Sequence, residues 1–339
     1  MTIGRIVLIT TAFLVPVAAY ATPQSILNPA GPAAAKLAFL GWIVFIVFAI
    51  VSAIVLGLLI WAVVRRTGSL SEHAPWNEGG GQGWILIGGF AIPFVILCVL
   101  YVLSLQRTTA FPLHDDDMAE MHPEILVIGH QWWWEVQYLS NSADQEFTTA
   151  SEIHIPTGRP VDIELKSADV IHSFWIPALH GKVQLVPGLT NYVRVQANRA
   201  GEFQGECAVY CGEQHAHMRL LVVAQPPADY AAWRNQQLKP ASPPQTPQAQ
   251  LGETVFNGSA CAMCHTVRGT EAQGTVGPDL THIAGRKYLA SDSYANNTAN
   301  LEAWITHAQS LKPGALMPNL TVYSGKELQN LVAYLQQLH

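Results

Sequence analysis

Charged residues are scarce in this chain. Of its 339 residues only 12% are Asp, Glu, Lys or Arg, whereas 50% are apolar, a balance that points to membrane-spanning segments. The formal charge of −6 excludes a generally basic surface and therefore argues against nucleic acid as a partner. The sequence contains no internal repeat and no glycine loop of the kind that binds phosphate. Its length predicts two or three domains.

Cysteine is also scarce, with five residues in the whole chain. Four of them fall into two short motifs, so no pair is left over for a structural disulfide. The fifth, Cys98, lies inside an apolar run, and we expect it to be a buried packing residue.

The first cysteine motif combines thiolates with imidazole and thioether groups. Cys207, Cys211, His215 and Met218 lie within twelve residues of one another, and His172 precedes them. Such a soft ligand set favours copper, with both cysteines bridging two metals, one histidine on each metal and Met218 as a weak axial ligand. A structural zinc site and a disulfide are the alternatives. Zinc rarely recruits Met, however, and a disulfide would need neither His215 nor Met218.

The second motif, Cys261-Ala-Met-Cys264-His265, has the C-x-x-C-H spacing of covalent haem c attachment. The two thiols add to the haem vinyl groups, and the adjacent histidine is then placed as the proximal iron ligand. Met317 lies on a loop bounded by prolines and is the candidate sixth ligand, with a core-filling methionine as the alternative. Ligation by His and Met suits electron transfer rather than oxygen binding.

The N-terminal third carries three apolar stretches. Residues 1–21 are expected to be a secretory signal that ends in Ala19-Tyr20-Ala21, with a third membrane helix as the alternative. The runs 37–64 and 84–105 predict a transmembrane hairpin, with buried helices of a large soluble protein as the alternative. The signal and the covalent haem place both later domains outside a bacterial cytoplasmic membrane, and the loop between the two runs inside.

The remainder of the chain divides into two domains. Residues 115–226 show short runs with period-two alternation, which predict an all-β sandwich or small barrel with the metal ligands on its loops. Residues 239–250 form a polar, Pro-rich linker, long enough to let the following domain swing. Residues 251–339 predict short helices around the haem motif, with helical spacing at 301–308 and 325–338.

Taken together, these motifs resemble subunit II of cytochrome c oxidases of the caa3 type, over nearly the whole chain after residue 21. The resemblance implies a two-helix membrane hairpin, a cupredoxin-like β-sandwich with the dicopper centre called CuA, and an all-α domain similar to class I cytochromes c. The segment Gly277-Pro278-Asp279-Leu280 resembles the cytochrome c loop in which a Pro carbonyl accepts the N–H of the proximal histidine, which assigns that role to Pro278.

The resemblance also implies roles for residues near the copper motif. Trp132, in Gly129-His130-Gln131-Trp132-Trp133-Trp134, corresponds to the residue that receives electrons from cytochrome c, with packing as the alternative, whereas Trp133 and Trp134 are expected to pack. The backbone carbonyl of Val209 would be a further copper ligand. The family commonly has Glu at position 209 and often Asp at position 184, where this chain has Gln184. We therefore expect no conventional magnesium site at the interface with subunit I.

The function implied is that of the subunit that accepts electrons in a membrane-bound haem–copper terminal oxidase. Electrons would pass from cytochrome c to haem c, then to CuA, then to haem in subunit I, which reduces oxygen to water and moves protons. Two alternatives remain. One is the copper-containing subunit of a nitric oxide reductase, and the other is a stand-alone electron carrier tethered to the membrane.

Overall fold

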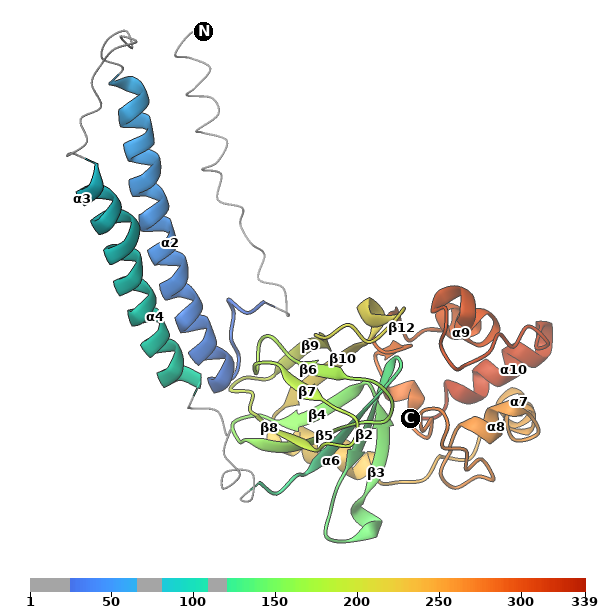
Figure 1. Ribbon diagram of the computed structural model, residues 1–339. Coiled ribbons are helices and arrows are strands. Elements are labelled where there is room, and N and C mark those ends of the chain that lie inside the picture. The colour runs from blue at the N-terminus through green and yellow to red at the C-terminus, as the bar shows by residue number, and fades with distance from the viewer. Residues whose placement is uncertain (1–24, 66–80, 109–120) are drawn as a thin grey trace.

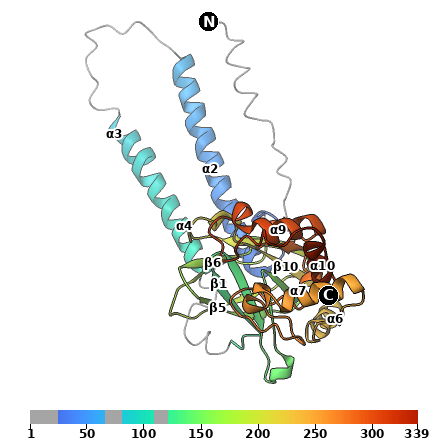
Figure 2. The same cartoon turned by 90° about the vertical axis from the view of Figure 1, so that its right-hand side faces the viewer.

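The computed structural model describes residues 25–65, 81–108 and 121–339 (Figure 1). The predicted signal segment, 1–21, lies outside these residues. Two long helices extend side by side from a β-sandwich, and a helical domain packs against the flank of the sandwich, as Figures 1 and 2 both show.

The two long helices are apolar along their whole length. Helix α2 spans Pro32–Val64, and the second helix is built from α3 (Gln82–Trp84), a π-helical stretch η1 (Ile85–Ala91) and α4 (Ile92–Thr108). Both are long and apolar enough to cross a membrane. Their side chains are largely exposed, as expected of a surface that lipid or partner helices cover. Cys98 is exposed on α4, so the expectation that it is buried is wrong within this chain.

The first membrane helix is attached directly to the β-sandwich. The Ala30 backbone N–H donates to Ala178 O at 2.7 Å, and Asn198 N–H donates to Ala30 O at 2.8 Å. Ala34 N–H donates to Leu179 O, and Ala34 and Ala38 are buried at the foot of α2. These backbone bonds fix the sandwich at the end of the membrane helix.

The sandwich consists of two five-stranded sheets, with strand orders β3-β2-β1-β5-β8 and β4-β10-β9-β6-β7. Alternate side chains of β1 and β2 are buried, which is the period-two pattern that the sequence predicts. The buried faces of both sheets form one core around Trp134, Phe174 and Phe203. The strands span Ile125–His130 (β1), Trp133–Tyr138 (β2), Phe147–Ala150 (β3), Glu152–Pro156 (β4), Val161–Ser167 (β5), His172–Trp175 (β6), Val183–Leu185 (β7), Asn191–Val195 (β8), Gly201–Cys207 (β9) and Arg219–Gln225 (β10).

A helix that the sequence analysis did not assign covers one end of this core. Helix α6 (Pro227–Gln237) packs Tyr230 and Trp233 against the sandwich. The Trp233 ring stacks on the His154 ring, with centroids 3.9 Å apart. We call residues 121–238, the sandwich with α6, the copper domain.

The C-terminal part, residues 239–339, is here called the haem domain. Its elements are α7 (Pro247–Asn257), α8 (Ala260–Cys264), η4 (Ile283–Gly285), the two-stranded hairpin β11 (Tyr288–Leu289) and β12 (Tyr294–Ala295), α9 (Thr298–Leu311) and α10 (Gly325–Leu335). Helices α7 and α10 cross closely, because a Cβ at Gly252 would lie only 2.0 Å from the Asn330 carbonyl oxygen. Only glycine permits this approach.

The predicted linker, 239–250, differs from a free tether. Its last four residues form the start of α7. Its first part lies along the haem domain: Lys239 O contacts His282 Nε2 at 3.0 Å, Ala241 N–H donates to Arg268 O at 2.8 Å, and Gln245 N–H donates to Gln337 Oε1 at 2.8 Å. These hydrogen bonds hold the segment against the haem domain itself, so the segment is not an extended free tether in this structure.

Candidate metal centres

The predicted copper ligands gather at one end of the second sheet. Strand β6 begins at His172 and pairs with the end of β9, so that Phe174 lies opposite Cys207. The chain then turns through Cys211 and the short helix η3 (His215–His217) before β10 returns. The Cys207 N–H donates to Met218 O at 3.0 Å, which closes this loop on itself.

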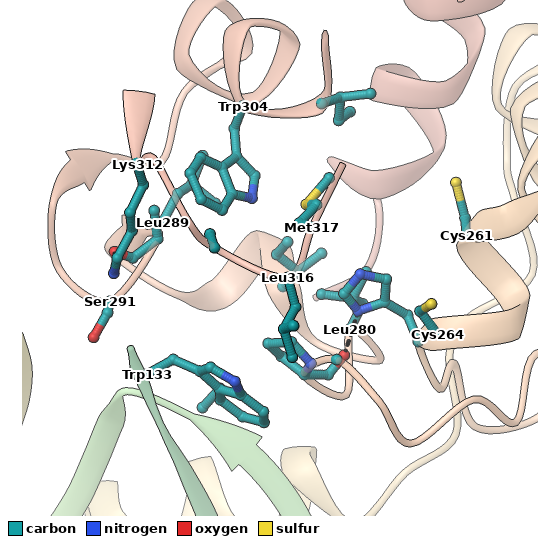
Figure 3. Close-up of a pocket in the computed structure, with 18 of the residues that line it drawn as sticks. Trp133, Cys261, Cys264, Leu280, Leu289, Ser291, Trp304, Lys312, Leu316 and Met317 are labelled. Atoms are coloured by element: carbon teal, nitrogen blue, oxygen red, sulfur yellow. Dashed lines mark hydrogen bonds between the residues drawn. The ribbon is translucent and has the colours of Figure 1, made fainter. Parts of the chain in front are cut away.

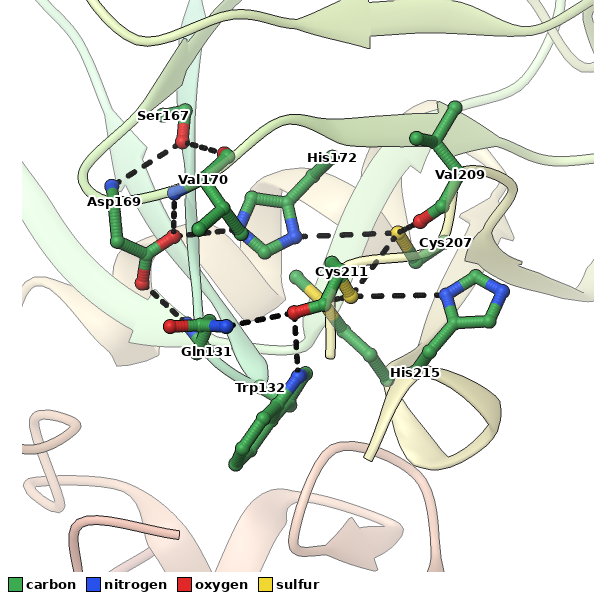
Figure 4. Close-up of polar contacts among 11 residues, drawn as sticks. Gln131, Trp132, Ser167, Asp169, Val170, His172, Cys207, Val209, Cys211 and His215 are labelled. Carbon is green, nitrogen blue, oxygen red and sulfur yellow. Dashed lines mark hydrogen bonds and ion pairs between the residues drawn. The ribbon is translucent and has the colours of Figure 1, made fainter. Parts of the chain in front are cut away.

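The sulfur and nitrogen atoms of these residues face one another (Figure 4). The two Sγ atoms are 3.7 Å apart; His172 Nδ1 lies 4.0 Å from Cys207 Sγ, and His215 Nδ1 lies 3.6 Å from Cys211 Sγ. Met218 Sδ lies 3.8 Å from Cys211 Sγ, and Val209 O lies 3.1 Å from Cys207 Sγ. A disulfide bond is about 2.05 Å long, so the two cysteines are free thiols at a spacing that leaves room for metal.

Each histidine approaches a different cysteine, which is the arrangement that a pair of bridged metals requires. His172, Cys207 and Cys211 are buried and offer ligand atoms within 4.8 Å of one another. The set of two thiols, two imidazoles and one thioether is soft, and it fits copper better than a hard cation. On this geometry the residues present fit the dicopper group.

A carboxylate fixes the orientation of the buried histidine. Asp169 Oδ1 lies 2.7 Å from His172 Nε2, which leaves Nδ1 directed at Cys207. Burial by itself lowers the pKa of His172, but the hydrogen bonds to Cys207 and Asp169 outweigh it, and the pKa is raised. Asp169 also accepts from the Gln131 N–H at 2.6 Å, which connects the histidine to the segment before β2.

The two thiols differ in acidity. The contact with Cys211 lowers the pKa of Cys207, with His172 and nearby backbone groups adding to the effect. The same contact raises the pKa of Cys211. One thiolate therefore forms readily at neutral pH, whereas the second proton leaves when a cation takes its place.

Trp132 is joined to the copper cluster by a hydrogen bond. Its Nε1–H donates to Cys211 O at 3.0 Å, and the Gln131 side-chain amide donates to the same oxygen at 2.7 Å. The sequence does not predict this role for Gln131, because no motif or spacing links a glutamine between aromatic residues to the copper ligands. Trp134 is fully buried, as expected of a packing residue.

The haem motif lies at the wall of a deep cavity (Figure 3). Ser259 caps α8 by accepting from the Cys261 N–H, and this short helix carries both Cys261 and Cys264. His265 follows in extended conformation, and its Nδ1 lies 2.8 Å from Pro278 O. This is the contact expected for Pro278. A Cβ at Gly277 would lie 2.6 Å from the His265 ring, so glycine lets the loop close over the imidazole.

Met317 lines the same cavity as Cys261, Cys264 and His265. The Gln309 side-chain amide donates to Met317 O at 2.7 Å and so fixes the loop that carries the thioether. Burial lowers the pKa of His265, which keeps its imidazole neutral and able to bind a metal. Apolar side chains make up most of the remaining wall, so the cavity fits a haem; they include Leu280, Ile283, Leu289, Leu301, Trp304, Ile305, Leu331 and Leu335.

One wall of this cavity comes from the copper domain. Gln131, Trp132 and Trp133 line it together with the haem motif. Figure 3 shows Trp133 facing the cavity below Leu316. The expectation that Trp133 only packs is therefore incomplete, because the neighbouring domain gives it a second role as part of the cavity wall.

These observations define a class of protein: a membrane-attached electron carrier with a copper-type cluster on a β-sandwich and a haem c cavity beside it. The comparisons with known proteins agree. The profile of the family described as "Cytochrome C oxidase subunit II, periplasmic domain" matches residues 139–225, and the profile "Cytochrome c" matches residues 249–339.

Full-length relatives extend this match to almost the whole chain. Cytochrome c oxidase subunit 2 of Alkalihalophilus pseudofirmus is 34% identical over 315 residues, which cover 92% of this chain and 90% of the relative. The protein of the same name from Bacillus subtilis is 29% identical over 341 residues, which cover 93% and 91%. The chain belongs to the cytochrome c oxidase subunit 2 family, and its two domains imply a CuA centre and a haem c.

Among solved structures, the periplasmic domain of subunit II of cytochrome oxidase from Bradyrhizobium japonicum is 26% identical. The match covers 33% of this chain and 91% of the Bradyrhizobium domain, with a TM-score of 0.31. At that score it adds nothing to the assignment.

Proposed function

We propose that this chain receives electrons at its haem domain and hands them to a partner subunit through a dicopper centre held by six residues. The single observation that carries this proposal is the pairing of each histidine with a different cysteine around two thiols 3.7 Å apart. The proposed copper ligands are His172, Cys207, the Val209 carbonyl, Cys211, His215 and Met218.

The subunit works in a haem–copper oxidase. Its relatives are oxidase subunits over more than nine-tenths of this chain, which supports an oxidase over a nitric oxide reductase or a stand-alone carrier. The two exposed apolar helices hold it in the inner membrane beside subunit I, with both metal domains on the periplasmic side. Cytochrome c is the donor, and oxygen is reduced in another subunit.

Within the haem domain, we assign covalent attachment to Cys261 and Cys264 and iron ligation to His265 and Met317. When bound, haem c and CuA each accept and release one electron at a time. The chain supplies the geometry: Pro278 O orients His265, and Gln309 holds the Met317 loop. Because all these side chains are already in place, little rearrangement accompanies each electron.

Trp132 is the proposed link between the two centres. It is 9% exposed, lines the haem cavity and donates to the Cys211 carbonyl, so its ring spans the distance between the cavity and a copper ligand. Val209 and Gln184 carry no carboxylate, so the absence of a conventional interface magnesium site remains a prediction.

The copper assignment is tested on the purified full-length complex by metal analysis and electron paramagnetic resonance. Cys207→Ser and Cys211→Ser should each abolish the mixed-valence signal of two coupled coppers, because the two thiolates together would hold both metals. Cys98→Ser, which changes the exposed cysteine on α4, is the matched control and should leave the signal intact. Stoichiometric zinc in place of copper in the native complex would overturn the assignment.

A further inference from the structure

Lys312 is a buried cation outside both metal clusters. It is only 3% exposed, and its ammonium donates to three backbone carbonyls: Trp132 O at 2.8 Å, His217 O at 2.9 Å and Ala290 O at 3.0 Å. An ammonium has three N–H donors, so every one of them is used. Burial lowers the pKa of Lys312 to about 7. The three carbonyl dipoles oppose that effect, because they favour the charged form.

The three carbonyls belong to two different domains. Two of them lie in the copper domain: Trp132 is the proposed electron link, and His217 lies between the proposed copper ligands His215 and Met218. Ala290 and Lys312 itself lie in the haem domain. Lys312 also ends α9 and begins the loop that leads to Met317. One side chain therefore connects the loop of the candidate iron ligand to the Trp132 backbone.

Other polar contacts surround this point. The Arg219 N–H donates to Ser291 O at 3.3 Å, and the Ser291 hydroxyl donates to Arg219 O at 2.6 Å. The Lys287 N–H donates to Glu152 Oε2 at 3.0 Å, and its ammonium pairs with Glu202. All four bonds join the haem domain to the copper domain, so the interface is built from specific partners and not from apolar contact alone.

The backbone at this interface is in an unfavourable conformation. Ala290, Ser291 and Asp292 have φ of 53°, 63° and 57°, three consecutive residues in the left-handed region without a glycine. Such residues persist only where their surroundings hold them. Here the surroundings are Lys312 on one side and the edge of the copper domain on the other.

We propose that Lys312 is a positioning residue that holds the haem domain docked on the copper domain, with Trp132 and Trp133 closing the haem cavity. The role of this docking in electron transfer rests on the proposed function, whereas the contacts of Lys312 do not depend on it. In the docked state Trp132 is covered, so an external donor delivers electrons to the haem and not to the copper cluster directly.

Two backbone amides report docking directly, because their acceptors lie on the opposite domain: Arg219 N–H to Ser291 O and Lys287 N–H to Glu152. In the purified full-length complex, Lys312→Met should raise their hydrogen–deuterium exchange on the order of a hundredfold, since three buried carbonyls lose a charged donor. The amides of Leu221 and Leu280, bonded within their own domains, should not change. Lys326→Met, at an exposed lysine of α10, is the matched control.

Unchanged exchange at Arg219 and Lys287 would overturn the proposal. So would a uniform rise across the whole haem domain, since that would mean that Lys312 stabilises the fold of that domain and not its docking. If Lys312→Met does not accumulate, Lys312→Arg serves instead: its planar guanidinium cannot direct three donors from one atom, and a smaller but equally selective rise is expected.

A second readout separates docking from the metal chemistry. Haem content and covalent attachment at Cys261 and Cys264 should stay at parent values in Lys312→Met, whereas electron transfer from haem to copper should slow. Failure of the copper assignment would appear as a missing mixed-valence signal in the parent protein, which leaves the exchange result untouched. A shifted haem potential with normal exchange would instead place Lys312 in the haem environment and refute the docking role.

Discussion

We expect docking to depend on pH through Asp292. It is buried at the interface, its Oδ1 has no hydrogen-bond partner among the described residues, and its Oδ2 is 3.4 Å from Gln204 Nε2 of the copper domain. Burial raises the pKa of Asp292 from 3.8 to about 6; Arg219 opposes the shift, and Glu152 adds to it. When the domains separate, the carboxyl group becomes exposed and its pKa returns toward 3.8.

A raised pKa means that the docked state binds the proton more tightly than the undocked state does. Its stabilising contribution is complete below pH 3.8 and disappears as the pH rises through about 6. Between pH 5 and pH 7 the docked state should lose about 1.4 kcal/mol of stability relative to the undocked state, because one pKa unit corresponds to about 1.36 kcal/mol. Solvent screening reduces this loss to about 1 kcal/mol. Docking should therefore weaken between fivefold and tenfold, roughly, over this range.

The perturbation is Asp292→Asn, which keeps the shape and removes the charge. The assay is the exchange of the Lys287 amide divided by that of the Leu280 amide, measured at pH 5 and pH 7, so that the intrinsic effect of pH cancels. Lys312, whose pKa burial lowers to about 7, titrates in the same range. It is present in both proteins, so the difference between parent and variant isolates Asp292. The variant should show the smaller pH dependence and the tighter docking at pH 7. Equal pH dependence in both proteins would refute the reasoning.

Three further outcomes follow from the geometry. Gly252→Ala should destabilise the haem domain by about 1–3 kcal/mol, because the added Cβ would meet the Asn330 carbonyl oxygen. Gly285→Ala is the control, since the space around Gly285 is open. Equal melting temperatures for the two variants would contradict the close crossing of α7 and α10. Met317→Ala should keep haem attached, lower its potential and let carbon monoxide bind the reduced form, and the exposed Met263→Ala should do none of these. Trp132→Phe removes the donor to Cys211 O and should slow electron transfer between the centres at unchanged metal content; a parent-like rate would exclude that hydrogen bond from the route.

Several features of this protein follow from the sequence by itself. The two membrane helices were predicted at 37–64 and 84–105 and are found at Pro32–Val64 and Gln82–Arg107, because long apolar runs have one stable solution in lipid. The haem motif is also recognisable from the sequence, because covalent attachment of haem requires two cysteines and a histidine at a fixed spacing. Strands such as β1 and β5 showed the alternation of a half-buried sheet.

Other strands gave no such signal. Strand β6 is buried along most of its length, and β7 spans only three residues, so neither shows a period of two. Strand β9 carries Gly201 and Gly205 among polar residues and owes its pairing to β10 and β6. These three strands are identified only from their pairing with neighbouring strands in the folded sheet. Two of them, β6 and β9, bring His172 beside Cys207.

The relation between the two metal domains was decided by the tertiary structure alone. From composition, residues 239–250 predicted a swinging tether, yet hydrogen bonds to the haem domain hold that segment. Lys312 and Trp132 are 180 residues apart, and no periodicity or motif connects them. Local patterns report local preferences, whereas a docked interface depends on two surfaces that meet only after each domain has folded.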